Sequence, residues 1–242
     1  DRSDVALTGS MADGLTLKQD KSSNRVRWEV EYPRGRSNGG ATLELRVPRS
    51  VEVQLGTISA NIDVADIDVR RLQANSVSGS ITAAGRSGET TLNTVSGGIR
   101  SQVQTPRLDA RTVSGQVLAG GGVSGEVAAE SVSGRVNVNA GRIQRLAVET
   151  VSGSLDVSAT GMAPGGKVTM QTVSGSVALK LPVNVSAQLN VKTFSGGIQS
   201  DAGQVEKPRY GPGSSLDARL GSGDGDISIN SHSGSVRVSL GR

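Results

Sequence analysis

A short unit, Thr/Ser-Val-Ser-Gly, recurs through most of this chain and constrains its fold more than any other feature. The serines of five successive copies are spaced by 18, 18, 19 and 19 residues, and later spacings widen to 22 and 21. Repetition at a nearly fixed period is typical of a solenoid, in which each coil packs against its neighbours. The repeated Ser and Gly residues are Ser78, Gly79, Ser96, Gly97, Ser114, Gly115, Ser133, Gly134, Ser152, Gly153, Ser174, Gly175, Ser195, Gly196, Ser233 and Gly234.

Apolar residues alternate with a period of two on both sides of each unit, as half-buried strands require. Leu108 and Ala110 precede one copy, and Val117 and Ala119 follow it. The two sets are out of phase, so the chain must bend near the Thr-Val pair, and each coil holds two short strands and a corner. The motif Gly either supplies an unusual dihedral angle or lets the backbone approach the next coil. The repeat predicts an all-β fold, a parallel β-helix (β-solenoid) of eight or nine coils.

Composition agrees with this fold and excludes several classes of function. With one Trp, one Phe and two Tyr among 242 residues, the core must be aliphatic. The absence of Cys excludes disulfides and thiolate metal sites. The 26 basic and 22 acidic residues are scattered, which argues against nucleic-acid binding. No apolar stretch approaches the roughly 20 residues of a membrane span.

The flanks of the repeat define the expected organisation. Residues 1–56 lack the unit but alternate like strands, and we expect them to form an N-terminal cap over the first coil of the solenoid at 57–242. Residues 203–215 break the spacing, and their Pro and Gly predict an inserted loop. Within that loop Arg209 and Tyr210 are the candidate partner-contact residues, and the alternative is that the loop only covers one edge of the coils.

No constellation for catalysis, cofactor or metal binding stands out. His232 is the only His and takes the Val position of the last copy, where we interpret it as a polar residue at the end of the column. Asp224 and Asp226 lie in a Gly-Asp-Gly-Asp stretch that does not fit the calcium-binding β-roll repeat. The residue after the motif Gly varies, so it forms no acidic column. We therefore predict no catalytic residue, no cofactor and no metal, in a protein that is not an enzyme.

The Thr and Ser of each unit suggest one regular surface. Pairs such as Thr112 and Ser114 recur in successive coils and, unless the corner separates them, form a Thr-x-Ser array like that of ice-binding solenoids. The other interpretation is that stacked hydroxyls satisfy one another.

The repeated Val-Ser-Gly-x-Val units follow a Val-Pro-x-x-Val-x-Val lead-in at residues 47–53. Together they resemble a bacterial family of β-strand-repeat proteins known as adhesin-like, a domain of unknown function, and the resemblance covers nearly the whole chain. It implies an extracytoplasmic protein, periplasmic or at the cell surface, and carries over no catalytic residue. The chain begins at Asp1 without Met, and we expect that a signal peptide has been removed.

Our leading hypothesis is a non-enzymatic, envelope-associated binding or scaffold protein whose partner is an envelope glycan or another protein. End-to-end self-association of solenoids is a further expectation. Two alternatives remain open: a carbohydrate-active enzyme with a groove near loop 203–215, and an ice-binding surface.

Overall fold

The computed structural model describes residues 5–13, 15–22, 25–31, 40–207 and 212–241, and within them there are strands and turns but no helix. The chain divides into two units, Asp1–Arg49 and Ser50–Arg242. The division lies before the boundary expected after residue 56, because strand β5 (Glu52–Thr57) pairs in parallel with the first long strand of the solenoid.

The first unit holds two antiparallel strand pairs. Its strands are β1 (Ala6–Met11), β2 (Thr16–Ser22), β3 (Arg25–Glu31) and β4 (Ala41–Arg46). β1 pairs with β4, and β2 pairs with β3. Trp28 is half-buried on β3, whereas Tyr32 lies outside the described residues. The capping role expected for this segment remains a prediction.

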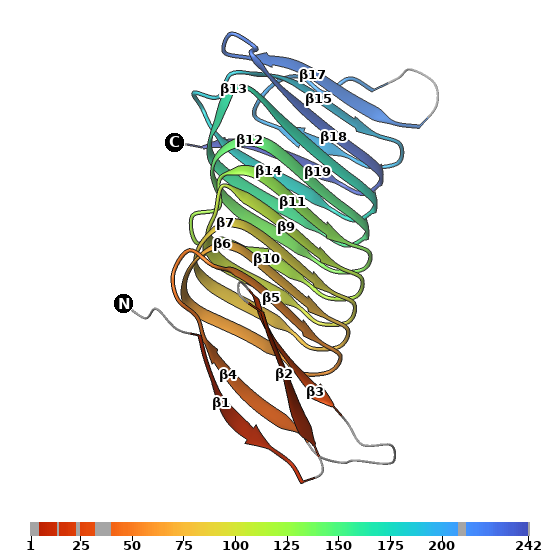
Figure 1. Cartoon of the computed structure of the whole chain (residues 1–242). Coiled ribbons are helices and arrows are strands. Elements are labelled where there is room, and N and C mark those ends of the chain that lie inside the picture. Colours follow the sequence, from red (N-terminus) through yellow and green to blue (C-terminus); the bar gives the residue numbers. More distant parts are fainter. Residues whose placement is uncertain (1–4, 14, 23–24, 32–39, 208–211, 242) are drawn as a thin grey trace. The chain divides into compact units, whose positions relative to one another are not determined.

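The second unit is a β-solenoid, as the repeat predicts (Figure 1). Apart from one antiparallel pair near its C-terminal end, its strands pair in parallel. Its strands after β5 are β6 (Ile62–Ser76), β7 (Ile81–Thr94), β8 (Ile99–Gln104), β9 (Arg107–Thr112), β10 (Val117–Ala119), β11 (Gly125–Ser131), β12 (Val136–Ser152), β13 (Leu155–Ser174), β14 (Val177–Pro182), β15 (Ala187–Thr193), β16 (Ile198–Ser200), β17 (Ser214–Leu220), β18 (Gly225–Ser233) and β19 (Val236–Gly241).

Each coil has the two strands and corner that the out-of-phase alternation predicts. β9 ends at Thr112, the corner follows, and β10 begins at Val117. Leu108 and Ala110 on one strand and Val117 on the next are at most 1% exposed, so both strands turn their alternating apolar residues inward. The largest fully buried side chains are Leu, Ile and Met, so the core within the described residues is aliphatic, as the composition requires.

The number of turns is smaller than predicted. Seven successive turns connect the corners from Ile58 to Phe194, rather than the eight or nine coils expected from counting motif copies. The last copy, at His232, forms a further coil that does not follow these seven turns in order, because the chain first reverses in β17, which pairs antiparallel with β15.

After that reversal, the C-terminal strands enter the stack between coils that precede them in the sequence. β18 pairs in parallel with β13 on one side and with β15 on the other. β19 pairs in the same way with β14 and β16. The loop expected at 203–215 ends earlier, since Ser214 and Ser215 belong to β17, and Glu206 forms a bridge with Ser215.

Candidate binding groove

In the corners at Thr94, Thr112 and Ser131, the turn is held by the hydroxyl group that precedes the motif Val. In one corner, Thr112 is 5% exposed and its Oγ1 accepts a hydrogen bond from the Gly115 N–H at 3.1 Å. The same Oγ1 donates to the Gly97 carbonyl of the neighbouring coil at 3.0 Å. Ser131 makes the equivalent bonds in the next corner. In these corners the buried hydroxyl closes the turn and joins adjacent turns. The hydroxyls of Thr172, Thr193 and Ser231, in later corners, are buried without a hydrogen-bond partner among the described residues.

The motif glycine is needed for the close approach of adjacent coils. A Cβ atom built on Gly115 would overlap the carbonyl oxygen of Gly97, and one on Gly97 would overlap that of Gly79. Neither Gly97 nor Gly115 has a φ in the left-handed region. Close contact between coils is therefore the explanation in these corners, whereas Gly175 and Gly234 combine the same contact with positive φ angles of 156° and 157°.

The corner also corrects the idea of an ice-binding Thr-x-Ser surface. The Thr residues point into the solenoid, whereas the motif serines, such as Ser114, are exposed. The chain turns between Thr112 and Ser114, so the two hydroxyls do not share a face. The described part of the solenoid has no flat array of paired hydroxyls at these corners.

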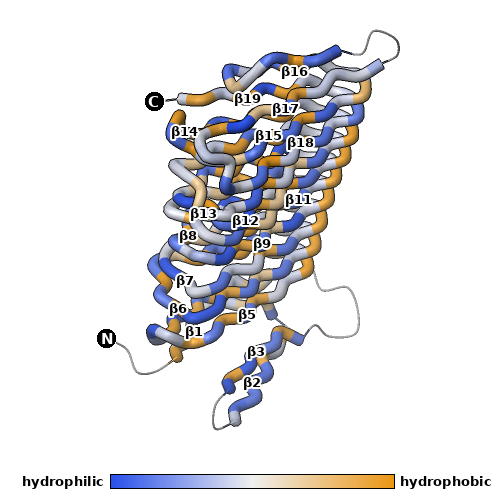
Figure 2. The backbone as a smooth tube through the Cα atoms, turned by 90° about the horizontal axis from the view of Figure 1, so that it is seen from above, coloured by the Kyte–Doolittle hydropathy of each residue, from blue (hydrophilic) through white to orange (hydrophobic). Residues whose placement is uncertain are grey.

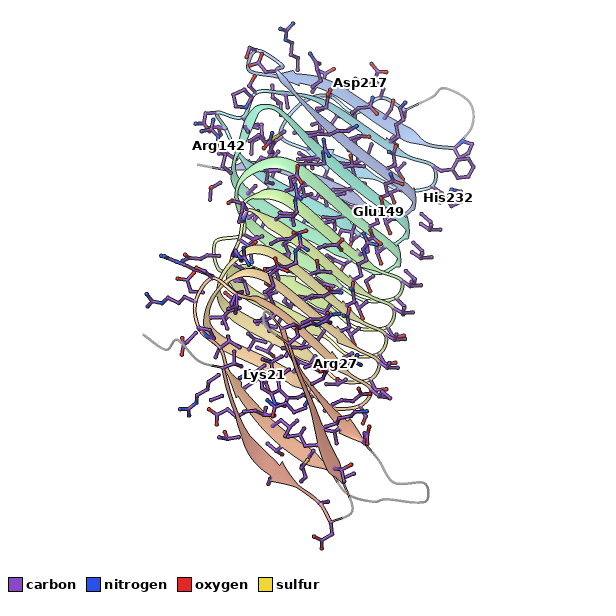
Figure 3. All side chains as sticks on the ribbon, in the orientation of Figure 1. Lys21, Arg27, Arg142, Glu149, Asp217 and His232 are labelled. Carbon is purple, nitrogen blue, oxygen red and sulfur yellow. The ribbon has the colours of Figure 1, made fainter. Side chains whose placement is uncertain are left out.

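The motif valines form the most regular exposed feature of the solenoid. They stand outside the corner, at 44–50% exposure, although they are aliphatic. Figure 2 shows hydrophobic residues stacked along this edge, and Figure 3 shows side chains projecting from it. The column contains Val77, Val95, Val113, Val132, Val151 and Val173. Parallel pairing sets successive members about 4.8 Å apart.

Near the C-terminal end of the solenoid, the column continues with two rings. The Phe194 and His232 rings are stacked, with centroids 4.9 Å apart and an angle of 5° between their planes. Gly234 packs on Gly175, and Gly196 packs on Gly234. His232 therefore lies between Val173 and Phe194. The expectation that it ends the column is wrong, because the stack does not follow the order of the sequence.

A second column runs beside the valines and makes the opposite wall of a groove. Its members lie two residues before each Val position and point outward, and the buried Thr or Ser between the two columns forms the floor. The groove has a volume of about 860 Å³. Its polar wall, in the order of the stack, is Asn93, Arg111, Glu130, Glu149, Gln171, Asn230 and Lys192.

Charges on the polar wall are partly paired. Arg111 binds Asp109 through two hydrogen bonds of 2.8 and 3.0 Å, and its guanidinium lies 3.5 Å from the Glu130 carboxylate on the next coil. The carboxylate of Asp109 is the main reason that the pKa of Arg111 is raised above its ordinary value. Figure 3 places Glu149 and His232 on the same side of the solenoid.

An acidic pair on the polar wall was not predicted, because the prediction of no acidic column rested only on the residues after the motif Gly. Glu130 and Glu149 are paired in register on adjacent strands. Their separation of 19 residues equals the repeat, and this spacing was the signal that could have found them.

Other candidates lie elsewhere or outside the described residues. Arg209 and Tyr210 fall in the segment 208–211, which the structure does not describe. No described residue of the 203–215 segment lines the groove. Asp224 accepts hydrogen bonds from the hydroxyls of Ser222 at 2.5 Å and Ser186 at 3.1 Å.

The described residues were also compared with what a metal site or a membrane-spanning helix requires. Among the residues with described positions, no three His, Cys, Asp or Glu side chains form a group that could hold a metal ion. The same residues include no helix with the length and apolarity of a membrane span.

These features define a β-solenoid domain with a groove along its row of corners. The chain belongs to the Toastrack DUF4097 family, whose model matches residues 11–239. Searches among curated proteins and among solved structures found no match. The family is a domain of unknown function, so the function must be argued from the groove.

Proposed function

We propose that this chain is a non-enzymatic binding scaffold of the cell envelope and that its groove binds a linear glycan. The observation that carries the proposal is the uninterrupted column of exposed valines beside a polar wall. Isolated exposed apolar residues are ordinary, but a contiguous row bordered by polar groups marks an interaction site. The resemblance to adhesin-like envelope proteins supports an extracytoplasmic location.

The chemistry of the two walls favours a hydroxyl-rich polymer. Amides such as Asn93 and Gln171 both donate and accept hydrogen bonds, and carboxylates such as Glu149 accept them, so the polar wall offers sugar hydroxyls a partner on successive coils. The valines and Phe194 offer an apolar surface to the carbon-bound hydrogens of the sugar rings. Because the groove crosses many coils, a linear ligand uses more of it than a small molecule does.

Binding fits this groove better than hydrolysis. Glu149 is exposed on an open wall, and the carboxylate of Glu130 faces the guanidinium of Arg111. General acid–base catalysis uses a pair of carboxyl groups in contrasting, sheltered environments. A carbohydrate-active enzyme remains the alternative, and release of shortened sugars from a glycan incubated with the protein would overturn our choice.

A binding experiment with a matched control tests the groove. The purified chain would be titrated with soluble linear glycans, including peptidoglycan strands, by isothermal titration calorimetry. Val151→Asp places a charge in the apolar wall and should weaken binding at least tenfold. Val183→Asp changes a valine that is 61% exposed and lies outside the groove, so it should leave the affinity unchanged. Equal effects of the two substitutions, or binding of a protein but no glycan, would contradict the assignment.

The location is tested separately by fractionating cells that express the full-length gene product. Recovery in the periplasmic or surface fraction is expected. Recovery only in the cytosol would refute the envelope assignment and would leave the assignment of the β-solenoid fold unchanged.

A further inference from the structure

The C-terminal strands β18 and β19 do not stack at the end of the solenoid, where their position in the sequence would place them. Up to the coil of β13 and β14, each turn of the solenoid stacks on the turn before it. β18 and β19 then lie between that coil and the coil of β15 and β16, which precedes them in the sequence. We call residues 225–241 the inserted coil and the space it fills the slot. β17 and β15 lie near β18 at the C-terminal end of the solenoid (Figure 1).

The slot holds the inserted coil through contacts that any copy of the repeat can make. Ile227 and Ile229 are at most 1% exposed and continue the core columns of the neighbouring strands. Ser228, which points outward between them, is paired with Thr169 of β13 and with Asn190 of β15. Residues 225–241 of a second chain can therefore make the same strand pairings with both edges of the slot as residues 225–241 of the first chain.

The connection to the inserted coil is short and easily rearranged. It consists of residues 221–224, in which Gly221 and Gly223 have φ angles of 56° and 77°. Its described side-chain hydrogen bonds join Asp224, Ser222 and Ser186, and the Arg219 guanidinium also donates to the Ser222 carbonyl. A short connection before a terminal element favours exchange of that element between identical chains.

We propose that two copies of this chain exchange their inserted coils. Residues 225–241 of one copy then fill the slot of the other, and the strand pairings of the monomer are kept because the slot edges are the same. Only the connection at 221–224 changes its path. Asn230 and His232, which line the groove, then come from the second chain, so each groove is completed by its partner.

The absence of Cys makes a cross-linking test direct. One chain carries Thr169→Cys and the other carries Ser228→Cys, with a tag on one chain so that the mixed dimer is resolved by size. The chains are unfolded together, refolded at high concentration, oxidised and separated without reductant. Paired parallel strands lie about 4.8 Å apart, within the reach of a disulfide. Exchange predicts a mixed, cross-linked dimer.

The matched control pairs Thr169→Cys with Asn190→Cys in separate chains. These positions are two strands apart, at about 9.6 Å, beyond the reach of a disulfide, whether or not exchange occurs. The test mixture should therefore give at least ten times more mixed dimer than the control mixture.

A third variant carries Thr169→Cys and Ser228→Cys in one chain. If it cross-links within the chain while the two-chain mixture gives no mixed dimer, the coil is inserted but does not exchange, and the proposal fails. If it forms no disulfide in either arrangement, Thr169 and Ser228 are not neighbours and the slot itself is refuted. Neither result bears on glycan binding by the groove.

Discussion

Replacing Gly97 with Ala tests whether the motif glycine is required by the close approach of adjacent corners. The added methyl group would overlap the Gly79 carbonyl, so the two corners must move apart. Two hydrogen bonds oppose this movement. One runs from the Ser96 N–H to the Val77 carbonyl at 2.9 Å, and the other from Thr94 Oγ1 to the Gly79 carbonyl at 3.0 Å.

The expected magnitude follows from these contacts. Forcing an extra methyl group into a packed site costs about 1–3 kcal/mol. Losing two hydrogen bonds adds about 1 kcal/mol for each. Gly97→Ala should therefore lower the free energy of unfolding by about 3–5 kcal/mol. Denaturant titration followed by circular dichroism would show this as a lower midpoint.

The neighbouring glycine provides the control. A Cβ atom on Gly98 would lie 3.6 Å from the carbonyl oxygen of Gln116, an ordinary contact, and its φ is outside the left-handed region. Gly98→Ala should leave the stability unchanged or raise it by up to about 1 kcal/mol, because alanine restricts the unfolded chain. Similar losses for Gly97→Ala and Gly98→Ala would refute the close-approach argument.

Three further predictions concern the corner, the connection and the core. Thr112→Val removes the buried hydroxyl that closes a turn and should cost about 1–3 kcal/mol by denaturant titration, whereas Ser114→Ala, at an exposed position, should cost nothing measurable. Hydrogen bonds from hydroxyls, first that of Ser222, lower the pKa of Asp224, so its carboxylate stabilises the fold above the unfolded-state pKa and this contribution is lost as the pH falls through the lowered value. Protection factors for hydrogen exchange in β18 should fall over that acidic window in the wild type but not in Asp224→Asn. Leu146→Ala leaves a cavity in the aliphatic core and should lower the free energy of unfolding by about 2–5 kcal/mol, as measured by the denaturant midpoint.

The local architecture of the solenoid could be predicted because it is written into each repeat. Alternating apolar residues define a strand, and a change of phase between Ala110 and Val117 requires a corner. The scarcity of aromatic residues already required an aliphatic core. These are short-range properties, and each copy of the repeat carries them independently.

The groove could be predicted only in part. The repeat predicts a column of Val residues, but whether these residues are exposed depends on where the corner turns. The corner turns after Thr112, so Thr112 points inward, whereas Val113 and Ser114 point outward. The polar wall was missed because only the residues after the motif Gly were compared, although the position two residues before each Val repeats with the same period. Stacking brings Glu130 and Glu149 together through strand pairing rather than through proximity in the chain.

The order of the last coils is what only the tertiary structure decided. The copies at Ser195 and Ser233 follow one another in the sequence, yet in the stack the second lies before the first. Because the edges of repeated coils are alike, the sequence of one copy does not specify its neighbours. The antiparallel turn through β17 reverses the chain and directs it back into the slot. The sequence alone determined that the chain forms coils and how each coil bends, and long-range pairing determined the order in which they stack.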